Sequence, residues 1–248
     1  YCDGGLFAGD RAWDDDGDGV ADRDYRGLRN LTAALDLAAA RFPKPRRVVF
    51  AGSSGGAYGT IIGLPLVRLS WPDAELRVIN DAGLGVAWGD EPERLSALVD
   101  ELGAQALVPA SCPDCLANGH LTGLVRWQLE RDPGLRIAAI SSLQDKVIAD
   151  WFLRIGGEAF EAAVRAQTAP LVVDFPNRYR RFLADGDAHT ALLGGIRGFI
   201  GDDVPEAVER VVAVGGLGVT VIADQAVGDW LRAFLAGDDP GWPDRVAR

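Results

Sequence analysis

The stretch VVFAGSSGGAYGT, residues 48–60, constrains the fold more than any other part of the sequence. Its four leading apolar residues predict a buried strand that runs directly into a turn rich in glycine and serine. Residues with helical spacing follow the turn. Residues 52–56 read Gly-Ser-Ser-Gly-Gly, which matches the pattern G-x-S-x-G centred on Ser54. A strand, a sharp turn and a helix in this order can hold a serine with its hydroxyl exposed for chemistry.

The chemistry of an activated serine explains the composition of this turn. Glycines beside Ser54 remove side chains that would collide with the strand and the helix. The amide N–H of the next residue, Gly55, can then donate a hydrogen bond to an oxyanion. Because the chain contains 31 glycines, the pentapeptide alone is a weak signal, and the flanking strand and helix carry the inference.

Short apolar strands alternate with helices along the rest of the chain. The apolar patterns predict strands at 46–51, 75–80, 135–141 and 178–184. Helical spacing predicts helices at 28–41, 57–69, 121–131, 145–166, 204–213 and 227–237. This alternation predicts an α/β fold, in which helices flank a mostly parallel central sheet, as a single domain over residues 1–248. Sites in such sheets lie beyond the carboxyl ends of the strands, so the residues after each strand are the first candidates.

The charge balance excludes two classes of protein. A formal net charge of −11 argues against binding to nucleic acid or to an anionic membrane, because both need a basic surface. No apolar run reaches the roughly 18 residues that a membrane-spanning helix requires. The sequence therefore predicts no nucleic-acid partner and no membrane span, and it leaves the oligomeric state open.

An activated serine needs a general base, and the chain contains only two histidines, His120 and His189. In proteins with this type of turn, the serine is followed along the chain by an acid and then by the histidine. His189 comes shortly after the strand expected at 178–184, which is where a base should lie. His120 comes near the start of a helix, and we interpret it as a surface or helix-capping residue. We therefore expect His189 to be the base.

The acid that orients the base should also follow a strand. Asp145 lies just past the strand expected at 135–141 and precedes His189, so we expect it to be the acid. Asp81 also follows a strand, but it comes early in the sheet, and we interpret it as capping a turn or bracing the serine turn. Gln144, next to Asp145, is a candidate for the lining of the active site. Asp185 and Asp187 lie close to His189 along the chain, and we interpret them as residues of a solvated loop.

The three cysteines are Cys2, Cys112 and Cys115. The last two form a C-x-x-C motif, but the sequence offers no second ligand pair for a zinc ion. The motif follows a proline-containing loop and does not follow a strand, which disfavours a redox site. We expect a local disulfide or two unpaired thiols there, with Cys2 left as the odd cysteine.

The acidic segment DDDGDGVADRDY, residues 14–25, resembles the opening of a calcium-binding loop. Asp14, Asp16 and Asp18 alternate ahead of Gly19, and Asp22 falls at the ninth loop position. The twelfth position holds Tyr25 in place of the glutamate that usually closes the site. A structural calcium site on these four aspartates and a solvated acidic loop both remain open.

Seven segments occur in an order that resembles a known family: YCDGG, RGLRN, GSSGGAYG, NDAG, SSLQD, HT and the tryptophan-rich end. Together they are similar to the pectin acetylesterase and Notum family of serine carboxylesterases, particularly its bacterial members. The resemblance spans nearly the whole chain and implies an α/β-hydrolase fold that hydrolyses a carboxylic ester without a required cofactor. The family's Ser–Asp–His triad falls on Ser54, Asp145 and His189, the residues already selected above.

Two departures from the family pattern affect this expectation. Gly55 stands where the family usually has alanine, which should still supply the oxyanion-hole amide. The family also carries a glycine-rich segment upstream of YCDGG, with a cysteine and further oxyanion-hole amides, so we expect the chain to be N-terminally incomplete and to lack the first strand or strands. Loss of one oxyanion-hole donor costs about 100- to 1,000-fold in rate.

The expected function is hydrolysis of an ester, most specifically an O-acetyl group on a carbohydrate, through an acyl-enzyme. The alternatives are a lipid or acyl esterase or an acyltransferase with the same triad, and a non-catalytic binding domain on a hydrolase scaffold. The expected partner is a small-molecule or carbohydrate ester. The resemblance and the candidate calcium loop imply an extracellular or cell-envelope location.

Overall fold

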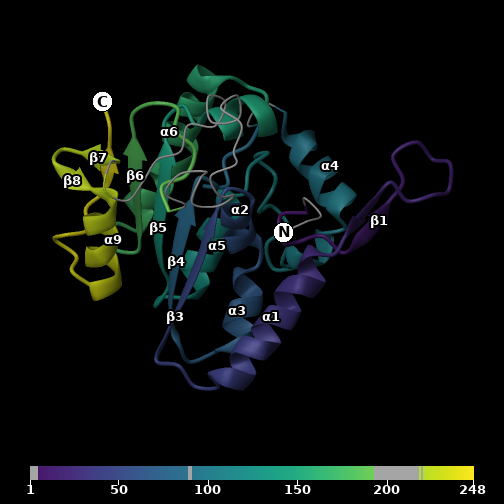
Figure 1. Ribbon diagram of the computed structural model, residues 1–248, viewed down its shortest axis with the longest axis horizontal. Coiled ribbons are helices and arrows are strands. Elements are labelled where there is room, and N and C mark those ends of the chain that lie inside the picture. Colours follow the sequence, from purple (N-terminus) through teal and green to yellow (C-terminus); the bar gives the residue numbers. More distant parts are fainter. Residues whose placement is uncertain (1–4, 89–90, 193–217, 219) are drawn as a thin grey trace, which may run out of the picture.

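The computed structural model describes residues 5–88, 91–192, 218 and 220–248, and its centre is a parallel sheet of five strands (Figure 1). The strand order is β3-β4-β5-β6-β9, and each neighbouring pair is parallel. The strands span Arg47–Ser53 (β3), Glu75–Asp81 (β4), Arg136–Ser142 (β5), Tyr179–Ala184 (β6) and Arg245–Val246 (β9). All four strands expected from the sequence are confirmed, and so is the α/β class. Within the described residues, β3 lies at the edge of the sheet.

The helices agree with most of the sequence predictions. The described α-helices are α1 (Gly27–Arg41), α2 (Gly55–Ile62), α3 (Leu64–Ser70), α4 (Pro92–Leu102), α5 (Thr122–Arg131), α6 (Gly157–Asp174) and α9 (Val227–Ala236). The helices expected at 28–41, 121–131 and 227–237 are confirmed, whereas the one expected at 204–213 lies outside the described residues.

Two helix predictions were wrong in detail, and one helix was missed. The helix expected at 57–69 divides at Gly63 into α2 and α3, and Pro65 takes the first turn of α3, where no amide donor is needed. The segment expected to be helical at 145–166 begins with a π-helix at Val147–Phe152, and α6 starts only at Gly157. The missed helix, α4, also begins with a proline and buries Leu95 and Leu102.

The two faces of the sheet bury different sets of side chains, because neighbouring residues of a strand point to opposite faces. Val78 of β4 and Ile137 of β5 belong to the larger core, which also receives apolar residues from α2, α3, α4, α5 and α6. Ile79 and Ile140 face the other way and pack with Trp230 of α9, together with Phe182, Phe234 and Trp242. The aromatic C-terminal end of the chain therefore covers one face of the sheet.

The C-terminal end of α9 is held by two arginines of the sheet. Arg47 of β3 donates to the carbonyl oxygen of Leu235 at 2.7 Å, and Arg77 of β4 donates to that of Phe234. Cations at a helix C-terminus satisfy the last carbonyls and complement the helix dipole. Glu75 accepts hydrogen bonds from both arginines, so its carboxylate joins the two contacts into one network.

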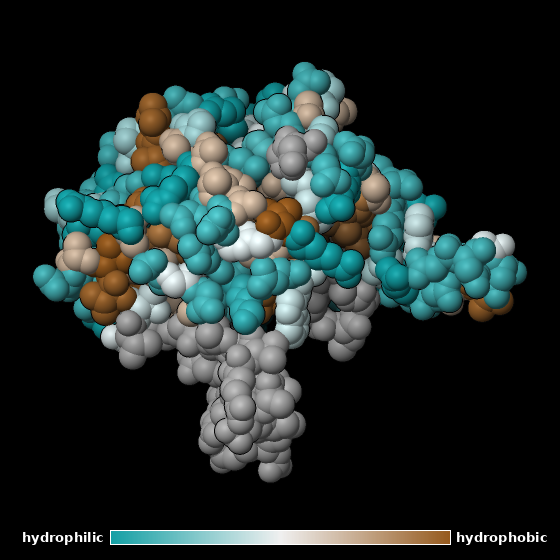
Figure 2. All heavy atoms as spheres, turned by 90° about the horizontal axis from the view of Figure 1, so that it is seen from above, coloured by the Kyte–Doolittle hydropathy of each residue, from teal (hydrophilic) through white to brown (hydrophobic). Residues whose placement is uncertain are grey.

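Two antiparallel hairpins do not pair with the central sheet. Strands β7 (Val221–Ile222) and β8 (Gln225–Ala226) precede α9, while β1 (Arg11–Trp13) and β2 (Arg23–Tyr25) form the first hairpin. The β1–β2 hairpin projects from the body at the right of Figure 1, and its surface is largely hydrophilic at the right of Figure 2. Its tip is the acidic segment of residues 14–22. Among the described residues, no helix is both long and apolar enough to cross a membrane.

Candidate active site

Ser54 lies on the turn between β3 and α2, as the sequence predicts. Its φ of 56° and ψ of −123° are unusual for a residue with a side chain, and strained backbone of this kind concentrates at functional sites. The turn has no room beside it, because a Cβ added at Gly52 would come within 2.1 Å of the carbonyl oxygen of Gly56. The first residue of the pattern, Gly52, is therefore a glycine for steric reasons.

Gly55 opens α2 directly after Ser54. The first amides of a helix have no carbonyl partner within the helix and carry the positive end of its dipole. An amide at this position is suited to hold a developing negative charge next to the serine. The structure thus gives Gly55 the location that the sequence predicts for an oxyanion-hole donor.

Asp145 and His189 are brought together from loops that follow β5 and β6. Nδ1 of His189 lies 2.9 Å from each of the two carboxylate oxygens of Asp145. The aspartate is 0% exposed and the histidine 7% exposed, so water barely competes for this contact. Asp145 also accepts hydrogen bonds from the amides of Val147 and Ile148, at 3.1 Å each, in the first turn of the π-helix.

Backbone hydrogen bonds fix the two loops against each other. The amide of Leu143 donates to the carbonyl oxygen of Ala184 at 2.8 Å, which continues the β5–β6 pairing beyond the strands. The amides of Gln144 and Lys146 donate to the carbonyl oxygens of Gly186 and Asp187, at 3.0 and 3.1 Å. The positions of Asp145 and His189 therefore follow from the register of two neighbouring strands.

Asp81, at the carboxyl end of β4, contacts chain neighbours of both Ser54 and His189. Asp81 accepts hydrogen bonds from Ser53, next to Ser54, and from the amides of Ala191 and Leu192, shortly after His189. No hydrogen bond joins Ser54 directly to His189 among the residues that the structure describes. Catalytic hydrogen bonds are often long in unliganded enzymes and tighten when substrate binds.

The site contains two fully buried carboxylates, and their charge affects neighbouring groups. Burial raises the pKa of Asp81, and the hydrogen bonds from Leu192, Ala191 and Ser53, with the charge of His189, oppose that rise. The pKa of Tyr58 is raised by burial first and then by the charge of Asp145. Tyr58 stays protonated and donates to the carbonyl oxygen of Val86 at 3.1 Å. Tyr58 is therefore a buried hydrogen-bond donor in α2.

Sequence reasoning did not single out Asn80, which supports α2 beneath the serine. Its side-chain amide donates to the carbonyl oxygens of Ala57 and Gly83, at 2.8 Å each. A Cβ added at Gly83 would meet the Cβ of Ala57 at 2.5 Å, so the NDAG turn packs tightly on the start of α2. The available signal was the polar pair Asn80-Asp81 at the end of a buried strand, two residues ahead of Gly83.

The other candidates from the sequence lie outside this cluster. His120 pairs through Nδ1 with the hydroxyl of Thr122 at 2.7 Å, next to the start of α5, and burial lowers the pKa of this histidine. Gln144 donates from its side chain to Glu161 at 3.2 Å and is exposed. Asp185 and Asp187 are exposed, as expected for a solvated loop.

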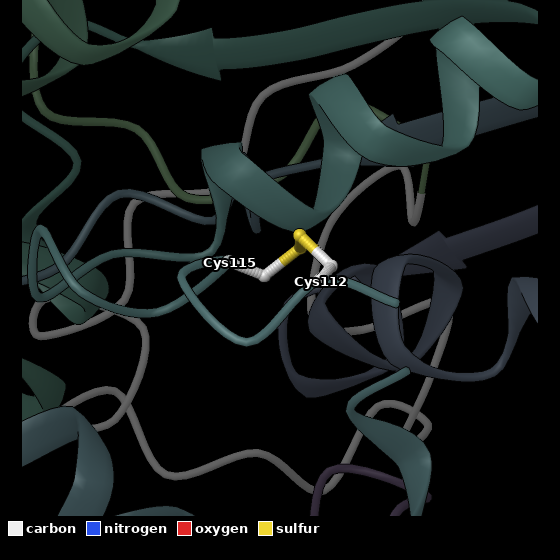
Figure 3. The surroundings of a disulfide bond; sticks show 2 residues. All are labelled: Cys112 and Cys115. Atoms are coloured by element: carbon white, nitrogen blue, oxygen red, sulfur yellow. A yellow bond between two sulfur atoms is a disulfide. The ribbon is translucent and has the colours of Figure 1, made fainter. Parts of the chain in front are cut away.

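Cys112 and Cys115 form a disulfide in the loop ahead of α5 (Figure 3). This outcome confirms one of the two alternatives that the sequence left open. The pair closes a short turn in which the amide of Cys115 donates to the carbonyl oxygen of Cys112 at 3.2 Å. Cys2 lies outside the described residues.

The acidic hairpin gathers three of the four aspartates expected to bind calcium. Carboxylate oxygens of Asp14, Asp16 and Asp18 all lie within 4.8 Å of one another. Asp22 is not part of this group, and its carboxylate accepts a hydrogen bond from the amide of Asp15 at 2.7 Å. Calcium binding by these aspartates, Asp22 included, stays a prediction.

An apolar hollow of about 630 Å³ lies beside Ser54. Its walls include Phe7, Leu31 and Leu192 together with Phe50 of β3, and the glycine-rich turn supplies its floor. Apolar walls with few polar groups are typical of sites that take the hydrocarbon part of a ligand.

Comparison with known proteins shows that the N-terminal part of the chain is similar to a known family. Residues 1–95 match the model of the pectinacetylesterase family. The family resemblance is confirmed. The matched residues include the serine turn and the NDAG turn. The match supports the activity of a carboxylic ester hydrolase. The chain had no match among the curated proteins.

Solved structures of the Wnt deacylase Notum from Drosophila share the fold. In one crystal form the likeness has a TM-score of 0.62 at 14% identity and covers 100% of this chain and 69% of that chain. In a second crystal form the TM-score is 0.57 at 14% identity, with coverage of 96% and 66%. The central sheet with its flanking helices is accordingly an α/β-hydrolase fold, as the sequence predicts.

Proposed function

We propose that this chain is a serine carboxylesterase that hydrolyses an O-acetyl ester on a carbohydrate through Ser54, His189 and Asp145. The observation that carries the proposal is the buried contact of His189 with Asp145, at the same end of the sheet as the strained Ser54 turn. The match to the pectinacetylesterase family supports the acetyl ester as the substrate class. The likeness to Notum, described as a Wnt deacylase, supports ester hydrolysis on this fold more generally.

The chemistry would proceed in two steps. Nδ1 of His189 faces Asp145, so Nε2 is the ring atom that accepts the proton of Ser54 while its oxygen attacks the ester carbonyl carbon. The Gly55 amide stabilises the oxyanion, and the alcohol leaves with the proton that His189 returns. Water, deprotonated by His189, then attacks the acyl-enzyme and releases acetate and free Ser54.

The apolar hollow beside Ser54 favours a second candidate, an esterase for a longer acyl chain. Phe7, Leu31 and Phe50 offer more apolar surface than an acetyl group can cover. The two candidates differ in chain-length preference, which 4-nitrophenyl esters measure directly. A kcat/KM that falls steadily from acetate through butyrate to octanoate supports deacetylation, whereas a maximum at octanoate supports the longer acyl group.

The proposal is tested by ester hydrolysis in the Ser54→Ala variant. We expect loss of about 10,000-fold or more in kcat on 4-nitrophenyl acetate, because the nucleophile is removed. The matched control is Ser70→Ala, at the end of α3, whose hydroxyl bonds only to the carbonyl oxygen of Leu66. Acetate release from acetylated pectin then tests the carbohydrate substrate.

Two results would contradict the proposal. If Ser54→Ala retains the wild-type rate, the turn does not carry the nucleophile. If the folded wild type hydrolyses no ester, the alternative of a non-catalytic domain on a hydrolase scaffold is the better reading.

We also propose that the protein works outside the cell or in the cell envelope. The Cys112–Cys115 disulfide supports this location, because disulfides persist mainly in oxidising compartments. Fractionation of the native host, followed by detection of the protein in the medium or envelope, tests the location directly. Recovery in the reducing cytosol would contradict it.

A further inference from the structure

Asp81 is the last residue of β4, and its carboxylate is fully buried. One carboxylate oxygen accepts hydrogen bonds from the hydroxyl of Ser53 at 2.8 Å and from the amide of Leu192 at 2.9 Å. The other oxygen accepts from the amide of Ala191 at 2.8 Å. The backbone carbonyl oxygen of Asp81 accepts from the amide of Ser54 at 2.8 Å.

These contacts join two parts of the chain that are far apart in sequence. Ser53 ends β3, which neighbours β4 in the sheet, and Ser54 follows it on the turn to α2. Ala191 and Leu192 follow β6, which is separated from β4 by β5 (Figure 1). The carboxylate of Asp81 therefore bridges from the serine turn, across the end of β5, to the loop that carries His189.

The backbone of the histidine loop is shaped to make this contact. Thr190 has a φ of 61°, which is rare for a β-branched residue, and it separates His189 from Ala191. Its conformation turns the chain so that the next two amides both donate to Asp81. The strained residue and the paired amides together hold His189 in one position.

Asp81 differs in role from Asp145. The ring of His189 bonds to Asp145, whereas Asp81 bonds to the backbone on one side of His189 and to the neighbour of Ser54 on the other. A carboxylate has two acceptor oxygens and can serve all three donors, while an asparagine has one acceptor oxygen and would leave an amide facing its own NH₂ group. Of the two side chains, only aspartate can therefore accept all three hydrogen bonds at this position.

We propose that Asp81 is a positioning residue that fixes the Ser54 turn relative to the His189 loop and thereby sustains the rate of the reaction. This inference rests on the proposed function. A 1 Å displacement of a catalytic group costs on the order of 100-fold in rate. Loss of the bridge should therefore lower turnover while the groups that contact substrate stay in place.

The first test compares Asp81→Asn with wild type on 4-nitrophenyl acetate. We expect kcat to fall about 10- to 100-fold, and KM to change by less than about threefold, because substrate contacts are retained. The matched control is Asp132→Asn, which breaks a carboxylate contact with Arg68 at the opposite end of the sheet. It should lower the melting temperature without changing kcat. A folded Asp81→Asn enzyme with wild-type kcat overturns the proposal.

Ser53→Ala supplies a second variant in case Asp81→Asn does not fold. This change removes one arm of the bridge, so we expect kcat to fall about three- to tenfold with KM unchanged. A Ser53→Ala enzyme that retains wild-type kcat overturns the proposal.

Amide hydrogen exchange tests the bridge independently of catalysis. In Asp81→Asn, or in Ser53→Ala if the former does not fold, residues 53–57 and 185–192 should both exchange faster, while residues of α1 exchange at the wild-type rate. If both segments loosen but the wild type shows no Ser54-dependent hydrolysis, the proposed function fails and the bridge stands. If neither segment changes, the bridge itself is wrong.

Discussion

The Nδ1 atom of His189 lies 2.9 Å from both carboxylate oxygens of Asp145, in a contact that solvent scarcely reaches. Because an ionised carboxylate can only accept hydrogen bonds, Nδ1 carries the hydrogen and Nε2 is left as the acceptor. This tautomer is the one that a general base for a serine requires. Asp145 thus sets which ring nitrogen of His189 is available for chemistry.

The first prediction concerns this tautomer. Asp145→Asn should lower kcat by about 1,000- to 10,000-fold, because an amide in this position can favour the wrong tautomer of His189. The control is Asp185→Asn, which changes an exposed aspartate of the histidine loop and should leave the rate unaltered. The measurement is kcat on 4-nitrophenyl acetate at a temperature where both variants are folded. A rate close to wild type in Asp145→Asn would show that this carboxylate does not act on the base.

The second prediction concerns the space around the serine turn. Gly52→Ala should destabilise the protein by about 2–4 kcal/mol or prevent folding, because the new Cβ would meet backbone that cannot move aside. Gly134→Ala is the matched control, since its Cβ would find only a carboxylate oxygen of Asp132, at 3.5 Å. Urea denaturation measures both. Equal stability of the two variants would contradict the steric argument.

The third prediction is a pH dependence of stability at Glu75. Burial of Glu75 opposes its ionisation, but hydrogen bonds and charges from Arg77 and Arg47 outweigh burial and hold its pKa below the usual value of 4.5. Its ionised form therefore stabilises the fold above that pH, and the contribution is lost as the pH falls through the lowered pKa. Glu75→Gln should cost about 1 kcal/mol near neutral pH.

The measurement is the free energy of unfolding of wild type and Glu75→Gln, by urea denaturation, at about pH 7 and about pH 3. The difference in free energy of unfolding between wild type and Glu75→Gln should be present at the higher pH and should become smaller at the lower pH. A gap that widens on acidification would have the wrong sign for a carboxylate with a lowered pKa.

The fourth prediction concerns calcium at the acidic hairpin. Asp14, Asp16 and Asp18 are gathered, but Asp22 is turned to the amide of Asp15 and Tyr25 replaces the closing glutamate. We expect binding no tighter than about millimolar, the range of weak extracellular sites. Calorimetric titration with calcium, repeated on Asp16→Asn, measures this. A dissociation constant below about 100 micromolar would contradict it.

The sheet and most helices could be predicted from the sequence because their signals are local. The apolar run at 135–141 forms a strand whose two faces are both covered, which removes polar residues from the pattern, whereas the run at 46–51 forms an edge strand that is only partly buried. The π-helix at Val147–Phe152 could not be predicted in this way. Its first amides turn toward the Asp145 carboxylate, a contact that depends on where β5 ends against β6.

The sequence by itself determined the strand–turn–helix at Ser54, the α/β class and the choice of His189 and Asp145, because each depends on residues that are neighbours in the chain or on the order of segments along it. Only the tertiary structure decided that Asp81 bridges the serine turn to the histidine loop, and that the Asp22 carboxylate accepts a hydrogen bond from the amide of Asp15. These contacts depend on which strand ends lie side by side and on how each loop satisfies its own amides. A buried carboxylate accepts hydrogen bonds from whichever donors the packed sheet brings within reach, and the spacing of residues in the sequence does not specify that distance.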